Sequence, residues 1–119
     1  MLDTARRRFP GRRLVVAFQP HQHQRTLVLL QQFADALARA DLSLVADIYG
    51  ARESEAMKAS VCAQDLVSAI RDRGGRCDRG GSVGDLPDRV SKVRRPEDLV
   101  LVLGAGDIDK AVEVIVAAI

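Results

Sequence analysis

The sequence predicts a single domain with a doubly wound, Rossmann-like α/β fold, in which helices cover both faces of a mostly parallel sheet. Three apolar runs of strand length occupy residues 13–19, 42–46 and 98–103. Nearly continuous apolar runs are typical of strands that are buried on both faces of a parallel sheet. Between the runs, apolar residues recur with the 3.6-residue period of helices. Strands that alternate with helices imply right-handed crossover connections, from which a parallel sheet is built.

Composition and charge exclude several classes of protein. The chain has 119 residues, enough for one domain, and 47% are hydrophobic but only 3% aromatic, so the core must be aliphatic. A net charge of +2 is too small to indicate a nucleic-acid partner. No apolar segment approaches the ~20 residues that span a bilayer, and the N-terminus has no signal-peptide pattern. We therefore expect a cytoplasmic protein that binds neither nucleic acid nor membrane, with Cys62 and Cys77 as reduced thiols.

The first part of the chain is expected to form helix, strand and helix. A short helix is predicted over residues 2–9 and a strand over 13–19, which Pro20 ends because proline cannot continue a strand interior. Thr26 precedes an apolar-periodic run and is therefore the expected N-cap of a helix over 26–39. The buried stripe of that helix is predicted to comprise Leu30, Phe33 and Leu37, with either Leu27 or Ala34.

The rest of the chain alternates in the same way. The expected elements are a strand at 42–46, a loop with some helical character at 51–59, a helix at about 61–73, a helix at about 85–93 and a strand at 98–103. The predicted buried face of the 61–73 helix comprises Cys62, Leu66, Val67 and Ile70. A last helix, capped by Asp107, is expected to bury Ala111, Val112, Ile115, Val116 and Ile119. Residues 76–84 occupy a strand position, but three glycines and two arginines make a poor strand.

Polar side chains gather where the first strand ends, which in an open α/β sheet is the edge where ligands bind. Arg25 lies just ahead of the expected helix N-terminus, where backbone N–H groups favour an anion. Its guanidinium could add bidentate contacts to a carboxylate or phosphate, and an ion pair with a neighbouring Asp is the equal alternative. His21 and His23 lie two residues apart, but zinc normally requires at least three protein ligands. We therefore expect no metal site.

Other candidate site residues follow the later strands. Asp47, Glu53 and Asp107 are near strand ends, where a carboxylate is either functional or simply solvated. Gly104-Ala105-Gly106 resembles the opening of a dinucleotide fingerprint, although the third glycine and the later acidic residue do not match. The chain contains no Gly-Lys-Ser/Thr, and hence no P-loop.

Taken together, several stretches resemble one family. They are Arg-Arg-Phe-Pro-Gly-Arg-Arg-Leu-Val-Val-Ala-Phe-Gln-Pro-His at 7–21, Arg25-Thr26, Asp47-Ile48-Tyr49 and Leu103-Gly104-Ala105-Gly106-Asp107-Ile108. In this order they are similar to the C-terminal domain of the Mur ligases, and most of all to the alanine-adding members. The resemblance covers essentially the whole chain.

The resemblance implies a role in the synthesis of peptidoglycan precursors. In the complete enzyme, ATP with magnesium phosphorylates the muramoyl carboxylate, and the amine of L-alanine attacks the acyl phosphate. The C-terminal domain closes over a central ATPase domain, and an N-terminal domain binds the UDP-sugar. These two domains are therefore the implied partners of the chain, and L-alanine is the implied substrate.

The resemblance also assigns residues to the site. By position, His21 and Arg25 would lie at the alanine and acyl-phosphate site, where Arg25 would neutralise negative charge and His21 would donate or accept a hydrogen bond. Asp47 and Tyr49 would line the next strand end, and Gly104, Ala105, Gly106 and Asp107 would form a nucleotide-side loop of the same rim. Gln22 and His23 stand where the family usually has Arg and Tyr, and loss of a guanidinium changes how a carboxylate is held.

Several parts of the family are missing from this sequence. They are the strand that precedes the domain, the P-loop domain, the uridine-nucleotide domain and the magnesium-binding machinery. We therefore expect the chain alone to hold no cofactor, to hydrolyse no ATP and to ligate no alanine. The alternative is a free-standing, catalytically silent module that binds a small anion or a partner protein. Without the preceding strand, the strand at 13–19 would be an open sheet edge, which would favour a homodimer.

Overall fold

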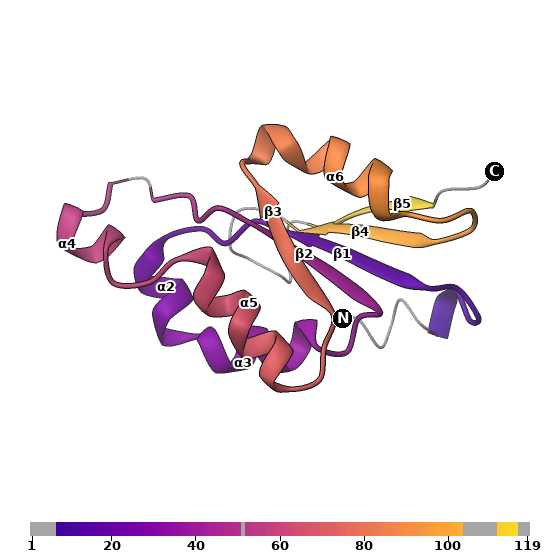
Figure 1. The fold of residues 1–119 in the computed structure, drawn as a ribbon, viewed down its shortest axis with the longest axis horizontal. Helices are drawn as coiled ribbons and strands as arrows, with labels where there is room; N and C mark the ends of the chain where they lie inside the picture. The colour runs from indigo at the N-terminus through magenta and orange to yellow at the C-terminus, as the bar shows by residue number, and fades with distance from the viewer. Residues whose placement is uncertain (1–6, 51, 104–111, 117–119) are drawn as a thin grey trace.

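The computed structural model describes residues 7–50, 52–103 and 112–116, with the backbone alone for Val83 and for 112–116. Five strands form one sheet in the order β3-β2-β1-β4-β5 (Figure 1). The strands are β1 Leu14–Phe18, β2 Leu42–Ala46, β3 Cys77–Gly81, β4 Leu99–Leu103 and β5 Val112–Val116. β1 to β4 are parallel to one another, which confirms the predicted doubly wound α/β fold.

β1 lies in the middle of the sheet rather than at its edge. Val16 pairs with Ser43 of β2 on one side and with Leu101 of β4 on the other. The expectation that this strand is an open edge is therefore wrong, because β4 arrives from the far end of the sequence to cover it. The strand-edge argument for a homodimer fails with it. The homodimer itself stays a prediction, which light scattering after size exclusion would test.

Helices cover both faces of the sheet (Figure 1). They are α2 His23–Val28, α3 Leu30–Leu37, α4 Glu55–Lys58, α5 Ala63–Asp72 and α6 Leu86–Val93, with a short 3-10 turn at Val83–Asp85. α3 and α5 enclose the larger cluster of buried side chains, in which the ring centroids of Phe18 and Phe33 are 5.3 Å apart. A smaller cluster lies under α6 on the other face and consists of Ala17, Leu44, Ala46 and Leu86. None of the helices in the described ranges is long and apolar enough to cross a membrane.

The helix predicted over 26–39 begins three residues earlier, at His23, and is interrupted at Leu29. Thr26 is not its N-cap. The Thr26 side chain is buried within α2, and its Oγ1 donates to the Gln22 carbonyl at 2.8 Å. The start of α2 depends instead on Glu53, whose carboxylate accepts from the His23 N–H at 2.6 Å.

The predicted buried stripes are largely confirmed, but Leu30 is only half-buried and Cys62 is exposed. In α3 they comprise Phe33, Ala34 and Leu37, and in α5 they include Leu66, Val67 and Ile70. Leu27 is 45% exposed, so Ala34 completes the first stripe. Cys62 is the exposed N-cap of α5 rather than part of its buried face. Both Cys62 and the buried Cys77 are free thiols.

Residues 77–81 form the strand β3 despite its glycines. A Cβ at Gly80 would lie 2.7 Å from Leu86 Cδ2, so the small residue lets α6 approach the sheet closely. Gly81 has φ +73°, in the region that favours glycine. Gly80 thus allows close packing of α6, and Gly81 lies where the register between β3 and β2 shifts.

The last predicted helix is wrong over residues 112–116. These residues form β5, which pairs antiparallel with β4. Four of its five residues are Val or Ile, and β-branched side chains favour strands over helices. The expected cap Asp107, together with Ala111 and Ile119, lies outside the described residues, as do residues 2–6 of the first predicted helix; Arg7 and Arg8 are helical.

Candidate functional site

The loop after β1 lies against the loop after β2 at the carboxyl edge of the sheet. The Gln22 N–H donates to the Tyr49 carbonyl at 2.6 Å, and the Tyr49 N–H donates to the Pro20 carbonyl at 2.9 Å. His21 and Tyr49 form a parallel bridge between the two loops. Three of the predicted site residues, His21, Gln22 and Tyr49, are therefore brought together.

The side chains of His21 and Tyr49 stack on each other. Their ring centroids are 5.2 Å apart, and the ring planes are inclined by 29°. His21 is half-buried, whereas Tyr49 is 52% exposed. A tyrosine in such a setting offers an apolar ring surface together with a polar tip. The pair can therefore contact a ligand at the sheet edge and donate or accept hydrogen bonds there.

A carboxylate from the second loop begins helix α2. Glu53 Oε1 accepts from the His23 N–H at 2.6 Å, and Oε2 accepts from the Gln24 N–H at 2.9 Å. The His23 ring nitrogen Nδ1 lies 2.9 Å from the same Oε1. The side chains of Glu53 and His23 are only 7% and 13% exposed. The N-cap residue of α2 is Gln22, whose side chain makes no capping hydrogen bond, and the Glu53 carboxylate supplies the capping acceptor that the sequence assigned to Thr26. Negative charge at a helix N-terminus is favourable.

The pKa of Glu53 follows from these contacts. Burial raises the pKa of the carboxyl group, but the backbone N–H groups of His23 and Gln24 and the His23 ring favour its ionised form. Together they lower the pKa from 4.5 to about 2. Glu53 is therefore an anion at neutral pH. A carboxylate of such low pKa is a weak general base, so its role here is to hold the two loops together.

Gly50 leaves room for the His23 ring. A Cβ at position 50 would lie 2.8 Å from His23 Cε1 and 2.9 Å from Nδ1. His23 is thus enclosed by Gly50 and Glu53, whereas His21 stacks on Tyr49. The two imidazoles have separate partners, and the part of the chain that the structure describes holds no group of three His, Cys, Asp or Glu residues that could bind a metal.

Gln22 has a strained backbone. Its φ of 70° is in the region that residues with a side chain rarely adopt. The Gln22 carbonyl accepts from the Thr26 N–H at 3.2 Å and from the Thr26 hydroxyl at 2.8 Å, which fixes the loop in this conformation. Such strain costs about 1–3 kcal/mol and persists only where the surrounding structure over-determines it, as at many functional sites.

Arg25 is exposed on α2, next to this loop. Together with Gln22, Gln24, Val28 and Leu29 it lines a shallow cavity of about 340 Å³. Among the described residues its guanidinium has no carboxylate partner, so the ion pair considered from the sequence is not found there. The positive charge is free to meet an anion.

Asp47 lies toward β3 instead. Its carboxylate accepts from Arg79 Nη2 at 3.0 Å, and its N–H donates to the Gly81 carbonyl at 2.8 Å. The structure thus pairs this predicted site residue with a cation of β3. The predicted nucleotide-side loop, Gly104, Ala105, Gly106 and Asp107, lies outside the described residues.

The contribution of Glu53 is the part of the site that the sequence does not reveal. The sequence identifies Glu53 only as an acid that is either solvated or functional. Its contact with the His23 N–H joins residues that are 30 positions apart, so no local capping pattern signals it. Gly50 carries no signal either, because its close neighbour is again His23.

About nine-tenths of the chain matches curated ligases of one kind. It is 46% identical over 114 residues to a UDP-N-acetylmuramate–L-alanine ligase of Sorangium cellulosum, which is 93% of this chain and 24% of that protein. For the enzyme of the same name from Salinibacter ruber the identity is 39% over 116 residues, 97% of this chain and 24% of the relative. For the enzyme of the same name from Clostridium tetani the identity is 35% over 109 residues, which is 91% of this chain and 23% of the relative. The chain thus spans about a quarter of the length of these relatives. No family model matches the sequence.

Proposed function

We propose that the chain acts as the C-terminal, amino-acid-binding domain of a UDP-N-acetylmuramate–L-alanine ligase, the kind of enzyme to which it is homologous along about nine-tenths of its length. The resemblance found in the sequence is thereby confirmed. In the proposed enzyme, ATP drives the joining of L-alanine to UDP-N-acetylmuramate. This domain supplies the surface that meets L-alanine and the acyl phosphate.

The observation that carries the proposal is the position of Arg25. Its guanidinium, which has no carboxylate partner in the described part of the chain, lies beside a loop that is fixed by the His21–Tyr49 stack and by Glu53. L-Alanine presents a carboxylate and an acyl phosphate presents further negative charge, and a guanidinium can bind either in a bidentate manner. His21 and Tyr49 supply hydrogen-bonding groups and an apolar surface next to this charge.

The described residues suit binding and orientation rather than proton transfer. Glu53 is held as an anion of low pKa and is already engaged by three groups. The described part of the chain offers no cluster of metal ligands, so we assign magnesium, and the phosphate cradle for ATP, to the other domains of the ligase. ATP would supply the acyl phosphate, and this domain would hold the amino acid in position for attack.

A chimeric enzyme tests this function. The matching quarter of the Sorangium cellulosum ligase is replaced by this chain, and L-alanine-dependent release of phosphate from ATP is measured with UDP-N-acetylmuramate present. We expect alanine-dependent turnover. A chimera that has the circular dichroism and melting temperature of a folded enzyme, but no such turnover, would contradict the proposal.

Arg25→Ala in this chimera tests the residue itself. Loss of a charged contact to the reacting centre removes about 2–4 kcal/mol of transition-state stabilisation, so kcat/KM should fall about 30- to 1000-fold. Arg76→Ala, which removes an exposed arginine just ahead of β3, is the matched control and should have little effect. If Arg25→Ala leaves kcat/KM unchanged, Arg25 has no role in binding the reactants.

A further inference from the structure

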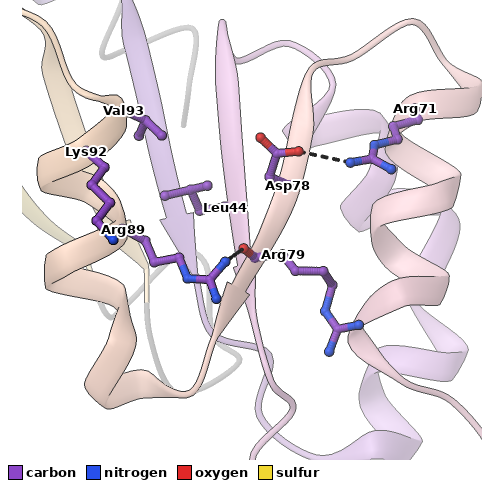
Figure 2. A pocket seen from close by; sticks show the side chains of 7 residues that line it. All are labelled: Leu44, Arg71, Asp78, Arg79, Arg89, Lys92 and Val93. Carbon is purple, nitrogen blue, oxygen red and sulfur yellow. Dashed lines mark hydrogen bonds and ion pairs between the residues drawn. The ribbon is translucent and has the colours of Figure 1, made fainter.

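A second hollow lies away from this site, at the β3 edge of the sheet. It has a volume of about 460 Å³ and is open to solvent. Its lining comes from β2, α5, β3 and α6 and comprises Leu44, Arg71, Asp78, Arg79, Arg89, Lys92 and Val93 (Figure 2). Four of these seven side chains are cationic and one is acidic. We call it the β3 cavity.

Two arginines of the β3 cavity bind the free edge of β3. The Arg76 carbonyl points toward β2, where it accepts from the Ser43 N–H at 2.9 Å. Because neighbouring residues of a strand point their backbone groups to opposite sides, the carbonyls of 77 and 79 point outward. Arg71 Nε donates to the Cys77 carbonyl at 2.9 Å, and Arg89 Nη1 donates to the Arg79 carbonyl at 3.1 Å (Figure 2). Both guanidinium groups are therefore held in place.

The charges of the β3 cavity are only partly neutralised. Arg71 forms an ion pair with Asp78 at 3.0 Å, and Arg79 forms one with Asp47 at 3.0 Å. Arg89 donates to a carbonyl, and its charge interacts with Asp85, which lies four residues earlier and also accepts from the Ser82 N–H. Its other N–H groups remain available to a ligand. Lys92 has no ion pair among the residues that the structure describes.

Arg89 and Lys92 face the same side of α6. They are three residues apart, a spacing that makes side chains neighbours on a helix surface. α6 is fixed against the sheet by the close contact of Leu86 with Gly80. The base of the β3 cavity is apolar. The fully buried Leu44 lies beneath it, and Val93 packs against the small cluster under α6. A cationic rim and an apolar base thus come from elements that are held rigidly together.

We propose that the β3 cavity binds a small phosphate-bearing molecule that has an apolar or aromatic part. The phosphate lies between Arg89 and Lys92, where the Arg89 guanidinium is preorganised for it. The apolar part lies on the half-buried side chain of Val93, above the buried Leu44. The volume is within the range of pockets that bind small organic ligands and exceeds what a bare phosphate needs. This site is separate from Arg25 and does not depend on the ligase function.

The test measures binding to the purified chain with three probes: AMP, inorganic phosphate and adenosine. Affinity is measured by isothermal titration calorimetry at about 50 mM and about 200 mM salt, and the binding site is mapped from ¹⁵N amide shifts. We expect AMP to bind more tightly than phosphate or adenosine, with shifts at residues 78–79 and 89–93. Binding should weaken at the higher salt concentration, because exposed charges are screened over about 8–10 Å near physiological ionic strength.

The variant Arg89→Gln/Lys92→Gln should weaken AMP binding at least tenfold. The matched control Arg52→Gln/Lys58→Gln removes the same charge from the loop before α4 and from α4 itself, and should leave the affinity within about twofold. Amide spectra of both variants show whether the fold is kept. Absence of AMP binding, or AMP shifts confined to residues 19–25, would overturn the proposal. Equal loss in the control variant would also overturn it, because the effect would then be one of net charge.

Discussion

One buried carboxylate at each end of the sheet ties loops together, and the two differ in their partners. At the amino end, Asp98 is 2% exposed and accepts from Arg13 Nη2 at 2.9 Å and from the Arg95 N–H at 2.7 Å. At the carboxyl end, Glu53 accepts from two backbone N–H groups of α2 and contacts the His23 ring. The side-chain partner of Asp98 is thus a guanidinium, whereas the side-chain partner of Glu53 is an imidazole.

The difference lies in what each carboxylate positions. Arg13 precedes β1, the Arg13 carbonyl accepts from the Leu99 N–H at 2.9 Å, and Arg13 Nη2 also donates to the Val93 carbonyl at 2.8 Å. Asp98 therefore connects the starts of two central strands with the end of α6. Glu53 connects the two loops of the candidate site. We infer that the same device mainly serves stability at one end of the sheet and site geometry at the other.

Asp98→Ala should have the largest effect on stability. Removing one partner of a buried pair leaves Arg13 without its carboxylate, which typically costs about 3–5 kcal/mol. Because the Arg13 side chain is 24% exposed, we expect about 3 kcal/mol. Urea unfolding followed by circular dichroism gives the free energy, and Asp88→Ala, an exposed acid of α6, is the control. A loss below about 1 kcal/mol would show that the amino end is not a stability element.

Glu53→Gln should change activity more than stability. The amide keeps the size of the side chain but replaces one accepting oxygen by a donor, so it can no longer accept from both α2 N–H groups. In the chimeric ligase we expect kcat/KM for L-alanine to fall about tenfold, while the unfolding midpoint at pH 7 falls less than in Asp98→Ala. Glu55→Gln, in α4, removes an exposed carboxylate nearby and is the control. Normal activity in Glu53→Gln would mean that the candidate site does not depend on this contact.

Acid should destabilise the wild-type protein, because both carboxylates stabilise the fold in their ionised form. Burial raises the pKa of Asp98, but its contacts with Arg13 and Arg95 outweigh burial, so the pKa is lowered overall. The pKa of Glu53 is about 2 in the folded chain. Because both pKa values are lower in the folded than in the unfolded state, the stabilisation is present above the unfolded pKa of about 4–4.5. It is lost as the pH falls from there toward about 2. Urea midpoints at pH 7, 4 and 3 should fall in wild type and fall less steeply in Glu53→Gln.

Identical pH slopes in wild type and Glu53→Gln would contradict the pKa of Glu53. Asp88→Ala provides the baseline for removal of an ordinary surface carboxylate.

The smallest expected effect is at Cys77, which reports opening of the whole domain. Burial raises the pKa of this thiol to about 12, while Cys62 is exposed. With a thiol reagent at neutral pH, Cys62 should react at once and Cys77 only as the domain unfolds. Asp98→Ala should speed labelling of Cys77 more than Glu53→Gln does. Equal acceleration in the two variants would show that both carboxylates stabilise the same unit to the same extent.

The sequence predicts the elements whose apolar pattern is local. β1, β2 and β4 are found because each is an almost unbroken apolar run, and α5 because its stripe has the helical period. The elements that depend on distant contacts are missed or misplaced. β3 has the composition of a loop, and its Gly80 is explained only once α6 packs against it. An amphipathic helix is predicted where β5 forms. The spacing of the apolar residues matches a helix there, whereas their β-branched side chains favour a strand.

The same distinction applies to the candidate site. Arg25, His21 and Tyr49 can be identified from the position of their loops after predicted strands and from the resemblance. That His21 stacks on Tyr49 could not be foreseen, since it depends on the pairing of the β1 and β2 loops. The N-cap is misplaced for a related reason, because the sequence offers a hydroxyl at Thr26 while the acceptor comes from Glu53 in another loop.

The arginines on the β3 edge also impose an order on the assembly of the fold. Arg71 belongs to α5, which precedes β3 in the chain, and Arg89 belongs to α6, which follows it. During synthesis the Cys77 carbonyl can be covered as soon as β3 docks, whereas the Arg79 carbonyl waits until α6 has formed and packed. In that interval the half-covered edge is open to strand pairing with another nascent or refolding chain, a common route to aggregation. Refolding yield should therefore decline with protein concentration, and most steeply in chains whose α6 is slow to dock.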